Sequence, residues 1–411
     1  MRPFFAWLPP KDGVWADAWP PPRYSSEPGL ELVDFPAANL IRAFGGDWWD
    51  NWARMTRARL YHWGCNTVAN WSEQKFCDWA GMPWVLPMSG FPTTGTRIFR
   101  DFPDVYAPEY ADNARVFAAQ LERYRDDRTL IGYFLSNEPH WAFVSELCIA
   151  EEVLKNPAPT HTKEALIAAL TRQYGTAAAL SSAWNHNFAS FDELRAPIRG
   201  AAALSPQARA DLEAFSSEMV RAFSRIPSEA CRAAAPHHLN LGMRYAYLGN
   251  PALIAGCEFF DVFSVNCYQM DPLPRIRQAA DLLAAQLGDE RGRPILVGEF
   301  HFGALDAGLP STGLRGVSSQ AERGRAYRYY VEQAATHPAF VGAHYFTIND
   351  QGPLGRADGE NYQIGMVDVC QQPYADFIDG VTAAHEAVLR VAEGLQVPTD
   401  RMAREIPSVA F

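Results

Sequence analysis

Apolar residues gather in short runs along the chain, and most of these runs are continuous rather than alternating with polar positions. Seven of them have the length of a strand: 66–71, 83–88, 130–135, 239–245, 262–268, 294–298 and 341–348. Continuous apolar runs are typical of parallel strands that are covered on both faces. Segments with helical spacing separate them: 52–63, 111–124, 163–174, 208–234, 273–287, 319–336 and 374–393. This alternation predicts an α/β protein with a parallel sheet and helices outside it.

The number of strand-like runs approaches eight, which predicts a single-domain (β/α)8 barrel (a TIM barrel) over residues 1–396. Residues 1–50 are expected to be largely irregular, and 397–411 to form a loose tail. Only Pro3–Leu8 is available as the first strand, and the Pro-rich sequence after it indicates loop. An open, doubly wound sheet is the alternative, and it is disfavoured because no Gly-rich phosphate loop follows an early strand.

Composition narrows the class of protein. The chain of 411 residues is 48% hydrophobic and 20% charged, as in an ordinary globular protein with a sizeable core. Its net charge of −11, with scattered basic residues, argues against a nucleic-acid partner. No apolar run reaches the ~18 residues that a membrane-spanning helix needs, so no membrane partner is expected. The aromatic content of 13% suits a sugar site, where flat apolar faces are favoured.

The seven cysteines are odd in number and include no C-x-x-C pair, which predicts free, buried thiols in a reducing compartment. The apolar stretch at the amino terminus is too short for a signal peptide, so we expect a cytoplasmic protein. A missing upstream segment would instead allow a periplasmic or secreted one. The sequence has no cluster with metal-ligand spacing, no nucleophile elbow and no phosphate loop, so we expect no metal and no cofactor.

Two glutamates each follow a buried-type strand run. Glu138 lies in Asn137-Glu138-Pro139 after the third run, and Glu299 follows the sixth. Retaining glycosidases use two carboxyl groups ~5–5.5 Å apart, and in a barrel the carboxyl ends of the strands converge on one mouth. We therefore predict Glu138 as acid/base, Glu299 as nucleophile and Asn137 as a ligand of a sugar hydroxyl. The alternative for each glutamate is a structural carboxylate that caps a helix.

Further polar and aromatic side chains lie near predicted strand ends and are candidates for substrate binding: Asn70, Trp71, Tyr268, His301, His344 and Tyr345. Tyr268 is placed to donate its hydroxyl to Glu299, the alternative being a core tyrosine. Asn70 and Trp71 offer a hydroxyl partner and a stacking face, or simply pack at the rim. The two histidines offer sugar contacts, although lone histidines are more often structural.

The chain resembles the clan A glycoside hydrolases and, within that clan, family 50, the β-agarases. The resemblance is carried by six segments: Phe5–Pro9, Phe35–Leu40, Trp63–Ser72, Ser136–Pro139, Gly298–Gly303 and Asp358–Gly365. A turn around Tyr174, Trp184 and Phe188 is also similar to family 42 β-galactosidases. The resemblance implies a retaining hydrolase of β-linked galactose units, exo-acting and releasing a disaccharide. By matching position it makes Glu138 the acid/base and Glu299 the nucleophile.

The sequence departs from the family at three points, one of which is the first strand, since in the family it lies upstream of segments like Phe5–Pro9. His344-Tyr345-Phe346 stands where clan members usually place a tryptophan, so the sugar-stacking platform is altered. The long amino-terminal carbohydrate-binding domain and the export typical of the family are not expected here, which favours soluble oligosaccharides over polymeric agarose. A general β-galactosidase or β-glycosidase of the same clan and a non-catalytic sugar-binding barrel stay open as alternatives, and so does the oligomeric state.

Overall fold

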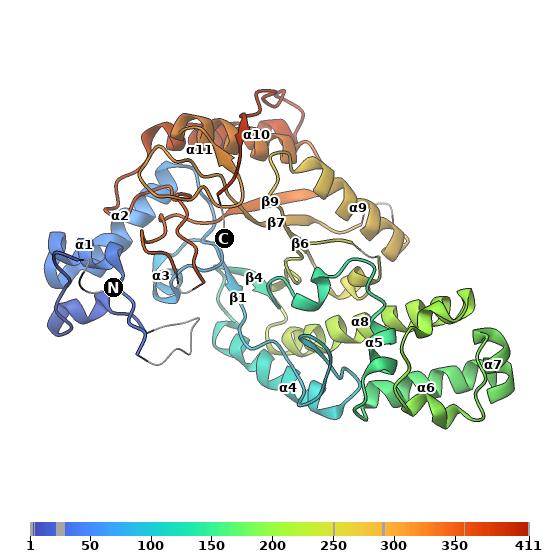
Figure 1. Ribbon diagram of the computed structural model, residues 1–411. Coiled ribbons are helices and arrows are strands. Elements are labelled where there is room, and N and C mark those ends of the chain that lie inside the picture. The colour runs from blue at the N-terminus through green and yellow to red at the C-terminus, as the bar shows by residue number, and fades with distance from the viewer. Residues whose placement is uncertain are drawn as a thin grey trace. The chain divides into compact units, whose positions relative to one another are not determined.

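The computed structural model describes residues 3, 5–21, 29–249, 251–289, 292–356 and 358–409 (Figure 1). The chain forms two compact units. The first consists of 1–82, 267–276 and 298–411, and the second of 83–266 and 277–297. The single domain over residues 1–396 stays a prediction.

The second unit is built on parallel strands. β1 (Trp84–Pro87), β4 (Leu130–Phe134) and β5 (Leu239–Asn240) form a sheet in the order β1-β4-β5, and each neighbouring pair is parallel. Gly132 lies at the centre of β4, where a Cβ atom would come within 2.2 Å of the Leu239 carbonyl oxygen. Only glycine therefore allows the backbones of β4 and β5 to approach so closely.

The parallel arrangement continues beyond β5. Tyr245 makes a parallel bridge to Val265 in β6 (Phe263–Asn266). β7 (Ile295–Phe300) begins beside β6, where the Phe263 N–H donates to the Pro294 carbonyl at 2.8 Å. Buried side chains from these strands form one apolar cluster: Val85, Phe134, Leu241, Val262 and Leu296. The apolar runs of the sequence thus form the sheet core, as their continuous pattern predicted.

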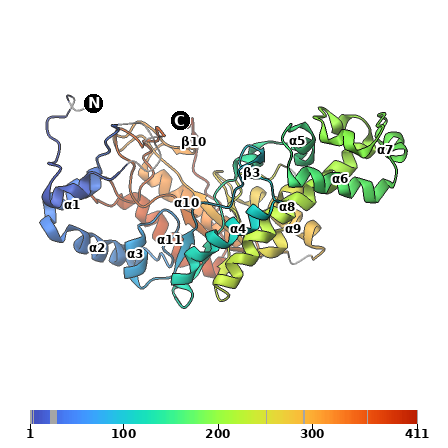
Figure 2. The same ribbon diagram turned by 90° about the horizontal axis from the view of Figure 1, so that it is seen from below.

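Helices flank these strands: α4 (Pro108–Ala118), α5 (Ile149–Lys155), α6 (His161–Tyr174), α7 (Ala177–Trp184), α8 (Pro206–Ala234) and α9 (Leu273–Leu287, which begins in the first unit). Two short strands, β2 (Arg97–Phe99) and β3 (Phe102–Pro103), pair in an antiparallel hairpin. Figure 2 shows α4 lying along α8. Ser205 begins α8 by accepting the Ala208 N–H at 3.0 Å, which satisfies one of the unpaired donors of the first turn.

The first unit contains the remaining elements: α1 (Phe35–Phe44), α2 (Trp48–His62), α3 (Gln74–Ala80), β8 (Gly316–Val317), α10 (Gln320–Ala335), β9 (Phe340–Tyr345), α11 (Ala375–Ala392) and β10 (Glu405–Ile406). β7 ends in this unit, where the Phe346 N–H after β9 donates to the Phe300 carbonyl at 3.0 Å. α10 and α11 pack side by side (Figure 1). A Cβ on Gly380 would lie 2.3 Å from the Gly324 Cα, so two glycines allow this close helix contact.

Two strand predictions are wrong. Residues 5–8 of the proposed first strand are irregular and Trp7 is 51% exposed, while residue 4 lies outside the described residues. The run 66–71 contains a single bridge residue, Val68, because the chain there turns back on itself and Trp71 adopts a positive φ of 68°. Among the described residues the sheets have two or three strands and do not close, so the eight-stranded barrel stays a prediction.

The chain ends are more ordered than expected. α1 and most of the first turn of α2 lie within residues 1–50, which were predicted to be largely irregular. The expectation of a loose tail is also wrong. β10 pairs antiparallel with β8, and the Thr399 N–H donates to the buried carboxylate of Glu332 at 2.6 Å. These polar contacts fix the tail on the first unit.

All seven cysteines are free, as predicted. Five are buried and Cys65 is half-buried, but Cys370 is exposed, so burial does not apply to every thiol. Over the residues that the structure describes, no helix combines the length and hydrophobicity needed to cross a membrane.

Candidate active site

Glu138 follows β4 in the second unit and is held in an uncommon backbone conformation. Its φ is 50°, in the left-handed region that non-glycine residues seldom occupy. The backbone N–H of Glu138 donates to the Met243 carbonyl at 3.3 Å, which ties the turn to the segment after β5. Such strained residues cluster at functional sites because the surrounding structure must impose them.

One amide holds both members of the Asn137-Glu138 pair. The Asn266 Nδ2 at the end of β6 donates to Glu138 Oε1 at 2.8 Å and to Asn137 Oδ1 at 3.2 Å. The buried guanidinium of Arg244 orients this amide, because its Nε donates to Asn266 Oδ1 at 3.3 Å. Sequence reasoning missed Asn266 and Arg244, although both lie at the ends of predicted strands, the same signal that identified Glu138.

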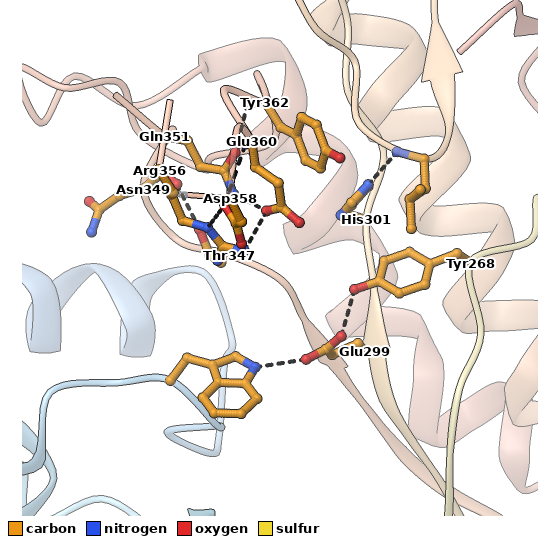
Figure 3. A network of polar contacts seen from close by, with 12 residues as sticks. Tyr268, Glu299, His301, Thr347, Asn349, Gln351, Arg356, Asp358, Glu360 and Tyr362 are labelled. Atoms are coloured by element: carbon orange, nitrogen blue, oxygen red, sulfur yellow. Dashed lines mark hydrogen bonds and ion pairs between the residues drawn. The ribbon is translucent and has the colours of Figure 1, made fainter. Parts of the chain in front are cut away.

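Glu299 lies in β7 of the first unit, and both of its carboxylate oxygens accept hydrogen bonds (Figure 3). The Tyr268 hydroxyl donates to Oε2 at 2.7 Å, which is the contact expected from the sequence. The Trp71 indole Nε1 donates to Oε1, also at 2.7 Å. Trp71 was expected to offer a stacking face or simply to pack at the rim. The residue is 46% exposed, so part of its surface is accessible to a ligand while its N–H is fixed.

His301 lies behind Tyr268 rather than in the open part of the site. Its ring centroid is 4.8 Å from that of Tyr268, and its Nε2 accepts the Leu314 N–H at 2.8 Å. Burial lowers the pKa of His301 to about 3, so the imidazole is neutral. Gly313, with a φ of 69°, must be glycine because a Cβ would lie 2.5 Å from His301 Nε2. The described contacts make His301 a support for Tyr268, and its contact with a sugar hydroxyl stays a prediction.

The other predicted ligands lie around the same strands. The Tyr345 hydroxyl donates to the Ile364 carbonyl at 2.8 Å and accepts from Arg323 at 3.1 Å, so its bonds are made within the protein. His344 is half-buried in β9. Asn70 precedes Trp71, and among the described residues its buried amide finds no hydrogen-bond partner. Sugar binding by these residues stays a prediction.

A third carboxylate, Glu360, belongs to the loop after β9 and was not singled out from the sequence. Its Oε2 accepts from Gln351 Nε2 at 2.7 Å and pairs with Arg356 Nη2 at 2.9 Å (Figure 3). Burial raises the pKa of Glu360, and the charges of Asp358 and Glu299 act in the same direction. The signal was present in the Asp358–Gly365 motif, which carried part of the family resemblance, but an irregular loop gives no periodicity that would point to one residue.

The parallel strands, with carboxylates and their donors at the carboxyl ends of β4, β6 and β7, define an α/β fold of the glycoside hydrolase kind. The family model for the family 42 β-galactosidases matches residues 97–293. That segment includes β4, Glu138 after it, and Asn266, which donates to Glu138.

More particularly, the chain is similar to β-agarases, and the resemblance to family 50 stated from its motifs is confirmed. It is 29% identical to β-agarase B of Vibrio sp. (strain JT0107) over 94% of this chain and 42% of that protein. The crystal structure of an agarase superposes with a TM-score of 0.80 at 30% identity, covering 95% of this chain and 57% of that one. The structure of an exo-β-agarase superposes with a TM-score of 0.83 at 28% identity, covering 95% of this chain and 54% of that one. The chain thus spans about half the length of the relatives it matches.

Proposed function

We propose that this chain is a retaining glycoside hydrolase that cleaves β-linked galactose units in oligosaccharides, in the manner of an agarase. The observation that carries the proposal is the pair of hydrogen bonds, each 2.7 Å long, that hold both oxygens of Glu299. A nucleophile must keep one orientation to attack an anomeric carbon, and two fixed donors provide that. Two of the similar structures are those of an agarase and an exo-β-agarase, which supports galactose as the sugar.

The proposed reaction has two displacements. Glu138 gives its proton to the glycosidic oxygen while a Glu299 oxygen bonds to the anomeric carbon, so that the bond to the leaving sugar breaks and a glycosyl-enzyme ester forms. Glu138, now ionised, then takes a proton from water as the water oxygen attacks the same carbon. The ester bond breaks and Glu299 returns to its carboxylate form, with the configuration of the sugar retained.

The proposal includes a closed (β/α)8 barrel, since a barrel mouth is the arrangement that brings the ends of β4 and β7 to the same substrate. Asn137 is the proposed ligand of a sugar hydroxyl, and the exposed face of Trp71 is the proposed stacking surface. Both roles follow the positions of these residues beside the two glutamates.

The proposal is tested by incubating the chain with neoagaro-oligosaccharides and, separately, with nitrophenyl β-galactoside. Mass spectrometry identifies the product and proton NMR its first anomeric form. We expect disaccharide release with retained configuration. Glu299→Ala should abolish turnover, and azide should restore cleavage as a glycosyl azide of opposite anomeric configuration. Turnover by Glu299→Ala at the native rate would overturn the assignment.

A general β-galactosidase is the second candidate, and the match of residues 97–293 to the family 42 model favours it. The same experiment separates the two, because such an enzyme would cleave nitrophenyl β-galactoside and leave neoagaro-oligosaccharides intact. Binding of saccharides by calorimetry without any product would instead indicate a non-catalytic sugar-binding protein.

A further inference from the structure

Only one of the two carboxylate oxygens of Glu360 is bonded by the other described residues of its loop. Gln351 and Arg356 both bond to Oε2, whereas no described residue donates to Oε1. The side chain is half-buried, and Oε1 is left to bond with solvent or a ligand rather than with a described residue. A carboxylate oxygen in that position is suited to accept a hydrogen bond from a ligand, because charge-assisted bonds to ionised groups are the strong ones.

One chain of contacts links Glu360 to Glu299 through aromatic rings. Arg356 lies over the Phe346 ring at 6.0 Å, and the Phe346 centroid is 6.1 Å from that of His301. The His301 ring in turn packs on Tyr268, the residue that bonds to Glu299. Figure 3 shows Arg356 and Glu360 on one side of this region, with His301, Tyr268 and Glu299 facing them.

A second chain of contacts reaches the same His301 ring through other residues. The Gln351 Oε1 accepts the Tyr362 N–H at 2.7 Å, while its Nε2 bonds to Glu360. The Tyr362 ring lies 5.8 Å from His301 in an edge-on arrangement. Two residues of the region that carries Glu360 therefore contact His301, the residue that packs on Tyr268. The charges of Glu360 and Glu299 are also close enough to interact.

We propose that Glu360 is a further substrate-binding residue, which accepts a hydrogen bond through Oε1 from a hydroxyl of the sugar that is attached to Glu299. Arg356 and Gln351 position it by holding Oε2. The inference rests on the proposed function, since it assigns a partner to the sugar of that reaction. It makes Glu360 a determinant of sugar specificity, because a site built to bond a hydroxyl rejects an analogue that lacks it.

The test uses the full chain and combines two changes, singly and together: substitution of Glu360 in the protein, and removal of one hydroxyl from the sugar. Glu360→Gln is compared with the wild type on the substrate that the wild type cleaves, neoagaro-oligosaccharide or nitrophenyl β-galactoside, and on derivatives of it that lack one hydroxyl of the sugar attached to Glu299. Loss of a hydrogen bond to a charged group predicts a decrease in kcat/KM of about 10- to 100-fold on the parent sugar. On one deoxy derivative the two proteins should differ less than about twofold, because the bond is already absent there.

Asp379→Asn is the matched control, because Asp379 is an exposed carboxylate of the same unit that lies in α11, away from the loop of Glu360. We expect its kcat/KM within about twofold of wild type on every sugar. Glu360→Asp keeps the charge but withdraws the oxygen by one methylene, and it should show the same sugar-dependent loss as Glu360→Gln.

The outcomes separate the two proposals. An active wild type whose Glu360 variants lose the same factor on every sugar, or lose nothing, overturns the role of Glu360 and leaves the hydrolase assignment intact. A wild type that cleaves neither the galactosides nor neoagaro-oligosaccharides overturns the proposed function, and the role of Glu360 with it.

Discussion

Asn266 and Tyr268 lie two residues apart at the end of one strand, and each donates a hydrogen bond to a different predicted catalytic glutamate. Asn266 bonds to Glu138 and Tyr268 bonds to Glu299. Asn266, the last residue of β6, thus holds one carboxylate, and Tyr268, two residues further on, holds the other.

We predict that Asn266→Ala lowers kcat/KM by about 10- to 100-fold, since a hydrogen bond to a charged group contributes ~1.5–3 kcal/mol. Asn266→Asp should lower it further, because a second carboxylate would repel Glu138. Steady-state kinetics on the substrate cleaved by the wild type measures both variants, with circular dichroism as the control for folding. A folded Asn266→Ala variant with native kinetics would show that the bond to Glu138 is not needed.

Trp71→Phe separates the two properties of Trp71, because it keeps an aromatic face and removes the indole N–H. We expect kcat to fall by about 10- to 100-fold with a change in KM below about threefold, since the lost donor orients Glu299. Trp71→Ala should raise KM as well. Trp79→Phe is the control. Trp79 lies in α3, is also partly exposed, at 37%, and has the Arg57 guanidinium of α2 over its ring. Equal effects at positions 71 and 79 would argue against a specific role for the Nε1 donor.

His301 should make stability depend on pH. Its pKa is lowered from 6.5 to about 3 by burial, so between these values the unfolded chain binds a proton that the folded chain does not. Stability therefore falls as pH decreases through this window, by about 2 kcal/mol between pH 7.5 and pH 5 for this one group. Urea unfolding at pH 7.5 and pH 5 should show a smaller pH-dependent loss in His301→Gln than in the wild type. The exposed His62→Gln should match the wild type.

Removal of residues 397–411 should destabilise the first unit, contrary to what a loose tail would do. The deletion removes the pairing of β10 with β8 and leaves the buried Glu332 carboxylate without the Thr399 N–H. An unsatisfied buried group costs about 1–3 kcal/mol, which a thermal melt would report as a lowered Tm. Val397→Ser, at a site 85% exposed, is the control for a change in the same segment. An unchanged Tm after the deletion would contradict the prediction.

The sequence predicted the fold well where apolar residues recur at helical spacing or form the continuous runs of buried strands. The long helices α8, α9, α10 and α11 lie where the helical spacing predicted them. The contact between Tyr268 and Glu299 was also expected, because strand ends are predictable from apolar runs.

Other features had no periodic signal. Residues 239–245 were predicted as a full strand, but only Leu239–Asn240 is regular, because Gly242 and Arg244 adopt positive φ angles. The bond from Trp71 to Glu299 depends on a similar turn, and Glu360 lies on an irregular loop. Such backbone conformations are imposed by tertiary contacts, so they could not be derived from local residue preferences.

Trp71, Glu138 and Arg244 share left-handed backbone angles of 68°, 50° and 51°. Glycine would adopt these angles without the steric penalty, which is about 1–2 kcal/mol for a residue with a Cβ. A library of variants selected only for resistance to heat would therefore be drawn toward glycine at these positions, and would lose the indole, the carboxylate and the guanidinium they carry. Any programme to stabilise this protein has to score turnover alongside melting temperature, because here the two selections oppose each other.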